Sequence, residues 1–280
     1  MERDDFDDIM DDPRFVPGIY NYCDRWCERC PYTERCRTFA MGERMKREAD
    51  AEDAEPQEAP QPANEAEPDA GDFFPEPDGE WEPEEDEEWD DEDFQEFQRR
   101  EERKDRVARS HPCARAAWRY TNMAEAWWKA HEAEVNEKLE LLGAEPPADP
   151  AAPDPGEEAI LLQDATEVIG WHQHQIWVKL MRALHEDDDM KELAEEMGFP
   201  KDSDGSAKVA LVGMDRSIAA WADVGRLLPS AAESVEPMVE LLVRLRRLAE
   251  RQFPDARAFI RPGFDEPLPP PGEDEDEEGS

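Results

Sequence analysis

The sequence lacks a long apolar run and a basic N-terminus. No stretch of about 18 consecutive apolar residues occurs among the 280 residues, so we expect no membrane-spanning helix. The first twelve residues are acidic, whereas a secretory signal begins with positive charge and continues into an apolar core. These features predict a cytoplasmic protein, in a compartment that keeps thiols reduced.

Basic residues are also scarce. The chain has 32 Lys and Arg against 74 Asp and Glu, which gives a formal net charge of -42. Phosphate recognition needs clustered Lys and Arg, so neither nucleic acid nor an anionic membrane is an expected partner. Mimicry of nucleic acid and a salt-rich cytoplasm are alternative reasons for such acidity. The acids concentrate in residues 1–12, 48–105 and 265–280, which we predict to be a disordered lead, linker and tail. An exposed helix is expected at the end of the linker, over residues 84–109.

Period-two alternation, the sign of a half-buried strand, is missing as well. Apolar residues between 106 and 264 recur at three- and four-residue steps, which predicts helices. We expect them over about 112–143, 156–186, 202–228 and 234–252, the third capped by Asp202 to Gly205. A shorter amphipathic segment is expected at 190–197. The chain is therefore predicted to be all-α, with an antiparallel four-helix bundle over residues 106–264.

Several polar and aromatic residues of these helices are candidates for function. His131 and His172 lie on apolar stripes without the Glu-x-x-His pairs of a di-iron site, so we expect them to pack in the core. Cys113 is expected to be a small buried side chain. Trp127 and Trp177 lie off the stripes and are candidate contacts for a protein partner. Charged residues near the stripes predict interhelical ion pairs or, alternatively, a polar pocket: Asp164, Glu167, Lys179, Arg182, Lys208, Asp215 and Arg216.

Cysteine is rare but concentrated. Four of the five cysteines, Cys23, Cys27, Cys30 and Cys36, fall within fourteen residues with the spacing Cys-x3-Cys-x2-Cys-x5-Cys. Four thiolates this close together can bind one metal ion or an iron–sulfur cluster. Residues 13–47, which we call the cysteine module, are too few to build a core, so metal binding would supply much of their folding free energy. A short helix is expected at 38–47.

The neighbours of the cysteines suggest how the site is supported. We expect the interleaved arginines to lower the pKa of the thiols and the aromatic residues to pack a shell around them. The arginines are Arg25, Arg29, Arg35 and Arg37, and the aromatic residues are Tyr20, Tyr22, Trp26, Tyr32 and Phe39. No histidine lies near the module, and the spacing differs from the paired knuckles of structural zinc sites. An all-thiolate set on one continuous loop favours a 4Fe–4S cluster; Zn²⁺ and a metal-free module are the alternatives.

The stretch Cys27-Glu28-Arg29-Cys30-Pro31-Tyr32-Thr33-Glu34-Arg35-Cys36 resembles the Cys-x2-Cys-Pro-x4-Cys segment of WhiB-like proteins. That resemblance implies that Cys27, Cys30 and Cys36 are ligands of a 4Fe–4S cluster. Cys23 takes the place of the family's distant fourth cysteine, and the family's Gly-Trp turn and basic tail are missing. Residues Cys23 to Cys30 also match the cysteine triplet of radical enzymes that cleave S-adenosylmethionine. Those enzymes need a barrel of alternating strands and helices, and this sequence predicts no strands.

The sequence thus predicts a non-enzymatic metal-binding protein. A redox- or iron-responsive or electron-transferring cysteine module would be tethered by the acidic linker to a helical domain that binds a partner protein. The first alternative is an enzyme or small-ligand binder with its site in the helical bundle and a structural zinc module. The second is an acidic adaptor for a basic partner.

Overall fold

The computed structural model describes residues 12–54, 91–144, 155–185 and 201–265. Residues 1–11, most of the predicted linker (55–90), the segment 190–197 and the tail from 266 lie outside the described residues. Within the described ranges all regular structure is helical and no strand is present, which confirms the all-α class. None of the described helices is long and apolar enough to cross a membrane.

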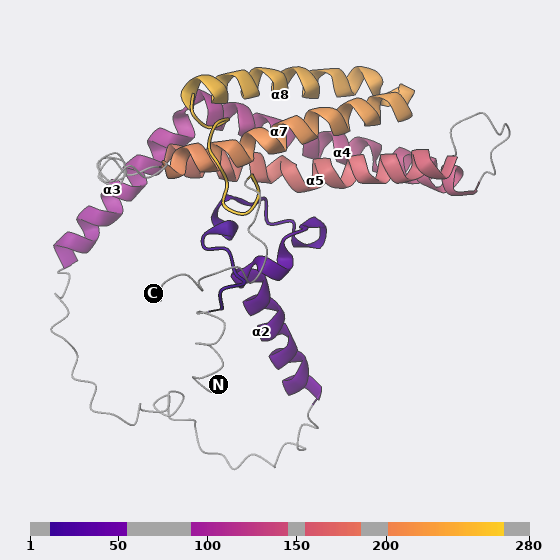
Figure 1. The fold of residues 1–280 in the computed structure, drawn as a ribbon. Helices are drawn as coiled ribbons and strands as arrows, with labels where there is room; N and C mark the ends of the chain where they lie inside the picture. Colours follow the sequence, from indigo (N-terminus) through magenta and orange to yellow (C-terminus); the bar gives the residue numbers. More distant parts are fainter. Residues whose placement is uncertain (1–11, 55–90, 145–154, 186–200, 266–280) are drawn as a thin grey trace, which may run out of the picture.

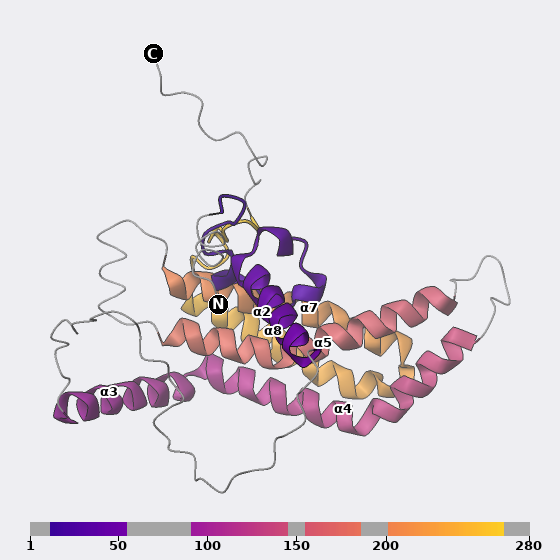
Figure 2. The same cartoon turned by 90° about the horizontal axis from the view of Figure 1, so that it is seen from below.

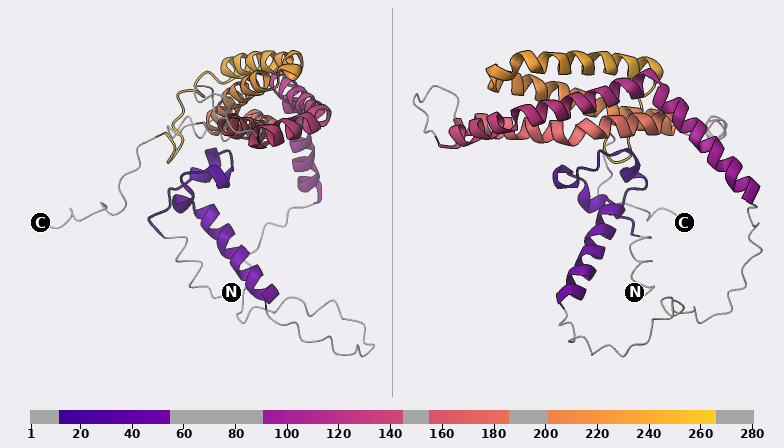
Figure 3. Two further views of the ribbon diagram at one scale, coloured as in Figure 1. Left: turned by 90° about the vertical axis from the view of Figure 1, so that its right-hand side faces the viewer. Right: turned by 180° about the vertical axis from the view of Figure 1, so that it is seen from behind.

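Four long helices pack side by side around one apolar core (Figures 1 and 3). They are α4 (Pro112–Ala144), α5 (Pro155–Leu184), α7 (Asp202–Leu227) and α8 (Ala232–Gln252). Helix α5 contacts α4 and α7, and α8 contacts α7 and α4. The largest fully buried side chains of the core are Tyr120, Leu162, Ile176, Leu180, Leu211, Met214, Trp221, Leu242 and Leu245. The bounds agree with the predicted helices to within a few residues because the apolar period and the prolines fix both ends.

Two further helices extend away from this core. Helix α3 (Asp91–Ser110) precedes α4 and projects beyond it, as Figure 2 shows. It is the exposed helix that the sequence predicts at the end of the linker. Helix α2 (Arg37–Ala54) follows the last cysteine of the module and points away from the long helices (Figure 1). It is longer than the predicted segment 38–47.

The predicted cap of α7 is wrong. The residue before the helix is Lys201, which makes no side-chain capping bond, and Asp202 to Gly205 form the first turn. The side chain of Asp202 instead accepts a hydrogen bond from Tyr22 of the cysteine module. The acidic residues still suit the positive end of the helix dipole.

Trp127 is not exposed, contrary to the prediction. Its side chain is buried, its Nε1 donates to Ser234 Oγ at 2.8 Å, and its ring meets Trp221 edge-on at 4.8 Å. Helix α4 packs against both α5 and α8, so its buried face is wider than a single stripe. Trp177 is half-buried against Trp118, and it is Trp118 that is half exposed.

The histidines and Cys113 pack as expected. His131 stacks on the Trp127 ring at 4.6 Å, and its Nδ1 lies 2.9 Å from the Trp127 carbonyl oxygen. His172 is fully buried in α5. Cys113 is buried too, and burial raises the pKa of its thiol to about 11, so it is a core side chain rather than a thiolate.

Candidate metal centre

Three single helical turns carry the four cysteines. They are η1 (Ile19–Tyr22), η2 (Cys27–Arg29) and η3 (Thr33–Arg35). Cys23 follows η1, Cys27 begins η2, and Cys30 and Cys36 follow η2 and η3. The amide of Cys30 donates to the Cys27 carbonyl oxygen at 3.2 Å, which closes η2. Each cysteine therefore lies where the chain changes direction, and this allows the loop to wrap inwards.

The four cysteines line one small cavity, of about 20 Å³. All four are half-buried and none forms a disulfide. The rest of the wall is mainly apolar and aromatic: Ile19, Tyr20, Trp26, Tyr32, Phe39 and Phe264. Four of the five predicted shell aromatics are among them. Tyr22 is the exception, because it packs edge-on against Phe259 at 4.7 Å instead. Phe264 comes from the other end of the chain, so sequence spacing gave no signal of it.

The electrostatics of the thiols differ from the prediction. Burial raises the pKa of both Cys23 and Cys27. Arg25 lowers the pKa of Cys23 as expected, but burial outweighs it. The other three cysteines also raise the pKa of Cys27, so the four thiols act on one another. Cys23 and Cys27 are therefore neutral thiols at neutral pH, and binding of a metal to them would release protons.

The arrangement does not form the shell of a single ion. Among the described residues no three His, Cys, Asp or Glu side chains are placed to hold a metal ion together. A zinc tetrathiolate, with zinc–sulfur bonds of about 2.3 Å, draws its sulfurs to within about 4 Å of one another. The cysteines share a cavity without closing to that geometry. Their type nonetheless suits a cluster, because iron–sulfur clusters are held by four thiolates.

Asp24, next to Cys23, joins the cysteine module to α5 and α7. Its backbone carbonyl accepts hydrogen bonds from Trp171 Nε1 at 2.9 Å and Gln175 Nε2 at 2.8 Å. Its carboxylate pairs with Arg216 at 2.7 Å. One residue of the loop is thus held from three sides by two helices.

Trp26, which precedes η2, and Arg29, the last residue of η2, make a second set of contacts with α5. The Trp26 ring stacks on Trp171 with centroids 5.1 Å apart, and the Arg29 guanidinium lies 4.2 Å from the centroid of the Trp26 ring. Arg29 also pairs with Asp164 and Glu167 of α5 at 2.5 Å each. The guanidinium of Arg29 is therefore directed towards α5.

Helix η1 rests on the start of α7. The Tyr22 hydroxyl donates to Asp202 at 3.0 Å, and Arg182 pairs with the same carboxylate at 2.8 Å. Gly205 lies directly below: a Cβ atom there would come within 2.3 Å of Tyr22 Cε1 and 2.7 Å of Phe259 Cζ. Lys179 Nζ reaches the carbonyl oxygen of Asn21 at 3.5 Å. A larger residue at position 205 would displace Tyr22, so the cysteine module needs glycine there to pack on α7.

The loop at residues 253–265 also packs against the cysteine module. Phe264 meets Tyr32 edge-on at 5.0 Å. Gly263 has a φ of 75°, and a Cβ there would lie 2.8 Å from Ile19 Cδ1. Lys208 of α7 ties this loop down through Asp265 at 2.8 Å.

The predicted ion pairs form only in part. Asp215 binds Arg246 of α8 at 2.8 Å, and Arg182 with Asp202 joins α5 to α7. The other charged residues near the stripes are not paired between long helices: Asp164, Glu167, Lys179 and Arg216 contact the cysteine module, and Lys208 contacts the terminal loop. The charged residues close to the apolar stripes of α5 and α7 were therefore the only indication in the sequence that the cysteine module packs on these two helices.

Compared with known proteins, the chain matches no family model, and neither a curated protein nor a solved structure shows significant similarity to it.

Proposed function

We propose that the chain is a non-enzymatic iron–sulfur protein in which Cys23, Cys27, Cys30 and Cys36 hold a 4Fe–4S cluster. The proposal is supported by the cavity that all four cysteines line. In addition, the other three thiols raise the pKa of Cys27, as expected of groups that lie close together. When bound, such a cluster supplies one-electron exchange and sensitivity to iron supply and oxidants.

Two arguments favour a cluster over zinc. The cysteines form an all-thiolate set on one continuous loop without a histidine, and their spacing differs from the paired knuckles of structural zinc sites. The likeness of Cys27 to Cys36 to WhiB-like proteins points the same way, as a resemblance over ten residues. The mainly apolar wall would limit access of water to the centre.

A redox- or iron-responsive role follows from the positions of the docking residues. Asp24 is adjacent to Cys23, Trp26 to Cys27, and Arg29 to Cys30. Any change in how these cysteines are held moves the residues that grip α5 and α7. The state of the centre would therefore alter the contact with the long helices.

We interpret the four long helices as an antiparallel four-helix bundle that binds a partner protein. Its candidate contact is Trp118, whose half-exposed ring lies 5.3 Å from that of Trp177. Exposed tryptophan flanked by apolar surface is typical of interface centres.

Anaerobic purification followed by metal analysis tests the proposal. The full-length chain is expected to be brown, with about four iron and four sulfide per chain. Cys27→Ser should lose most of that iron. Cys113→Ala is the matched control, because the fifth cysteine lies in the helical core, and it should keep the iron. Colourless protein with one zinc per chain, or equal iron in wild type and Cys27→Ser, would overturn the proposal.

A further inference from the structure

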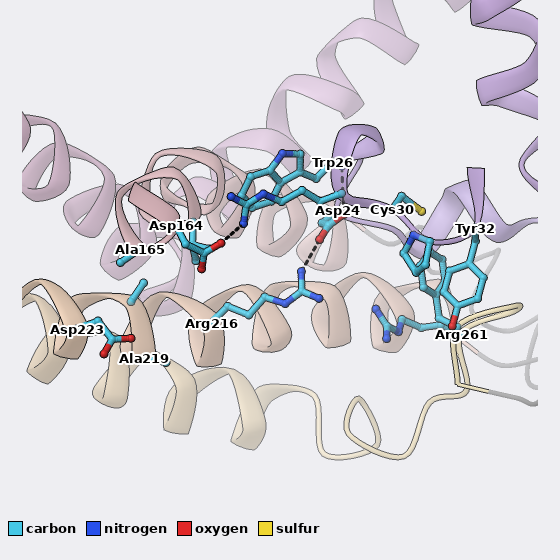
Figure 4. Close-up of a pocket in the computed structure, with 15 residues that line it drawn as sticks. Asp24, Trp26, Cys30, Tyr32, Asp164, Ala165, Arg216, Ala219, Asp223 and Arg261 are labelled. Atoms are coloured by element: carbon cyan, nitrogen blue, oxygen red, sulfur yellow. Dashed lines mark hydrogen bonds and ion pairs between the residues drawn. The ribbon is translucent and has the colours of Figure 1, made fainter. Parts of the chain in front are cut away.

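A second and larger cavity lies between the cysteine module and the long helices (Figure 4). Its volume is about 610 Å³, within the range of about 300–1,000 Å³ typical of small-molecule sites. We call it the charged cleft. Cys30 lines both the charged cleft and the cavity of the cysteines, so a molecule in the cleft would lie beside the candidate metal centre.

The floor of the charged cleft is apolar and made of small residues. Ala165 and Val168 come from α5, and Ala219 and Ala220 from α7. The aromatic side chains of Trp26, Tyr32 and Phe264 add apolar wall. Small side chains on the floor leave room for an apolar group of a ligand.

The charges in the cleft are balanced and separated. Its lining contains three arginines and three aspartates, although the whole chain has a net charge of -42. In Figure 4, Asp164 and Asp223 lie towards one end, Arg261 towards the other, and Arg216 between them. A ligand with one charge of each sign would match this arrangement, whereas a simple anion would be repelled by the acidic chain.

Groups in the cleft keep free hydrogen-bonding capacity. Arg216 binds Asp24 through Nη1, and Arg261 binds Asp265 through Nε and Nη2. Within the described part of the chain, Arg216 Nη2 and Arg261 Nη1 donate to no protein acceptor. Asp223 has only a long contact with Arg226, at 3.6 Å. Two guanidinium donors and one carboxylate therefore remain for a ligand, and charge-assisted bonds of this kind are strong.

We propose that the charged cleft binds a small zwitterion with an apolar body, namely an apolar α-amino acid or a short peptide with free termini. Its ammonium group would bind at Asp223, and its carboxylate at Arg216 and Arg261. The apolar body would cover the alanine floor. The inference does not depend on the metal centre.

Isothermal titration calorimetry on the full-length protein tests it with L-phenylalanine and L-phenylalanyl-L-phenylalanine as probes. At least one is expected to bind, and which one binds tells a free amino acid from a peptide. N-acetyl-L-phenylalanine lacks the ammonium group and phenethylamine lacks the carboxylate. Each should bind about tenfold or more weakly than L-phenylalanine if that is the ligand, because one charged contact is lost. If only the peptide binds, its N-acetylated and its amidated forms replace these two controls.

Variants place the ligand in the cleft. Arg216→Gln and Asp223→Asn should each weaken binding about tenfold or more, and Ala219→Leu should block it by filling the floor. Arg244→Gln, an exposed arginine on α8, is the matched control and should bind normally. The proposal is overturned if neither probe binds at about 10 mM, or if the three cleft variants bind like the control. Iron content, measured on the same samples, reports separately on the metal centre.

Discussion

The cysteine module and the four long helices are stabilised by different physics. The helices bury a continuous apolar core with many fully buried side chains. The module contributes only Phe15 and Ile19 to the buried apolar residues, and before α2 it forms only single turns. It is held instead by directional contacts at Asp24, Trp26 and Arg29. We therefore expect the helices to keep their fold when the module is released, and the module to need the helices for its own.

A cavity in the helical core should destabilise the four long helices and leave the cysteine module unaffected. Leu211→Ala removes a fully buried side chain of α7 and should lower the free energy of unfolding by about 2–5 kcal/mol. Urea denaturation followed by helical circular dichroism measures this loss. Iron binding should stay unchanged under native conditions, because Leu211 does not line the cysteine cavity. A variant that keeps its stability but loses iron would reverse the comparison.

Acid should destabilise the fold through a single histidine. Burial lowers the pKa of His172 to about 4, from an ordinary value of 6.5. Between pH 6.5 and 4 the unfolded chain takes up a proton that folded His172 does not, so stability present above pH 6.5 is lost as the pH falls. The loss is about 2–3 kcal/mol.

The measurement is the free energy of unfolding at several pH values between 7 and 4.5. His172→Leu should flatten the dependence on pH. His174→Gln, at an exposed neighbouring histidine, should leave the slope as it is. An unchanged slope in His172→Leu would show that other groups cause the acid sensitivity.

The glycine under Tyr22 tests the docking contact with one methyl group. Gly205→Ala places a Cβ against Tyr22 and Phe259, and should weaken docking by about 1–3 kcal/mol. Exchange of the Trp171 indole proton, which bonds to Asp24, reports on docking by NMR. Gly170→Ala in α5 is the matched control because its Cβ would meet nothing within 4 Å. It should increase helix stability by about 0.5–1 kcal/mol and leave the exchange rate unaltered.

The smallest effect is expected at Arg29. Arg29→Gln removes two ion pairs and a contact with Trp26, but its side chain is 36% exposed, so docking should weaken by about 1 kcal/mol or less. The same indole exchange measures it, and the difference from wild type should shrink at high salt. A much larger loss would mean that charge, rather than shape, holds the module.

The long helices were predictable because their information is local. Repeated apolar steps and the stops at Gly143 and Pro229 set their bounds without reference to the rest of the chain. The convergence of the four cysteines followed from short spacing in the same way. Both depend on residues that are neighbours in the sequence.

What could not be predicted depends on contacts between distant segments. Trp127 is buried because α4 packs against α8 as well as α5. Asp164, Glu167 and Arg216 pair with residues about 135 to 190 positions away in the sequence. The pKa of Cys23 and of Cys27 is raised where the sequence predicts lowering, because arginine is visible in a sequence and burial is not. A side chain's charge can be read locally, but its solvent exposure is a property of the whole fold.

The loop that carries Gly263 and Phe264 packs against the cysteine module, and this has a consequence for biosynthesis. The cysteine-bearing segment emerges from the ribosome first, yet the wall that Phe264 closes is made more than two hundred residues later. At about 5–20 residues per second, that interval lasts roughly 10 s or longer. Insertion of the proposed cluster during translation would meet an open loop, and insertion afterwards would meet a covered one.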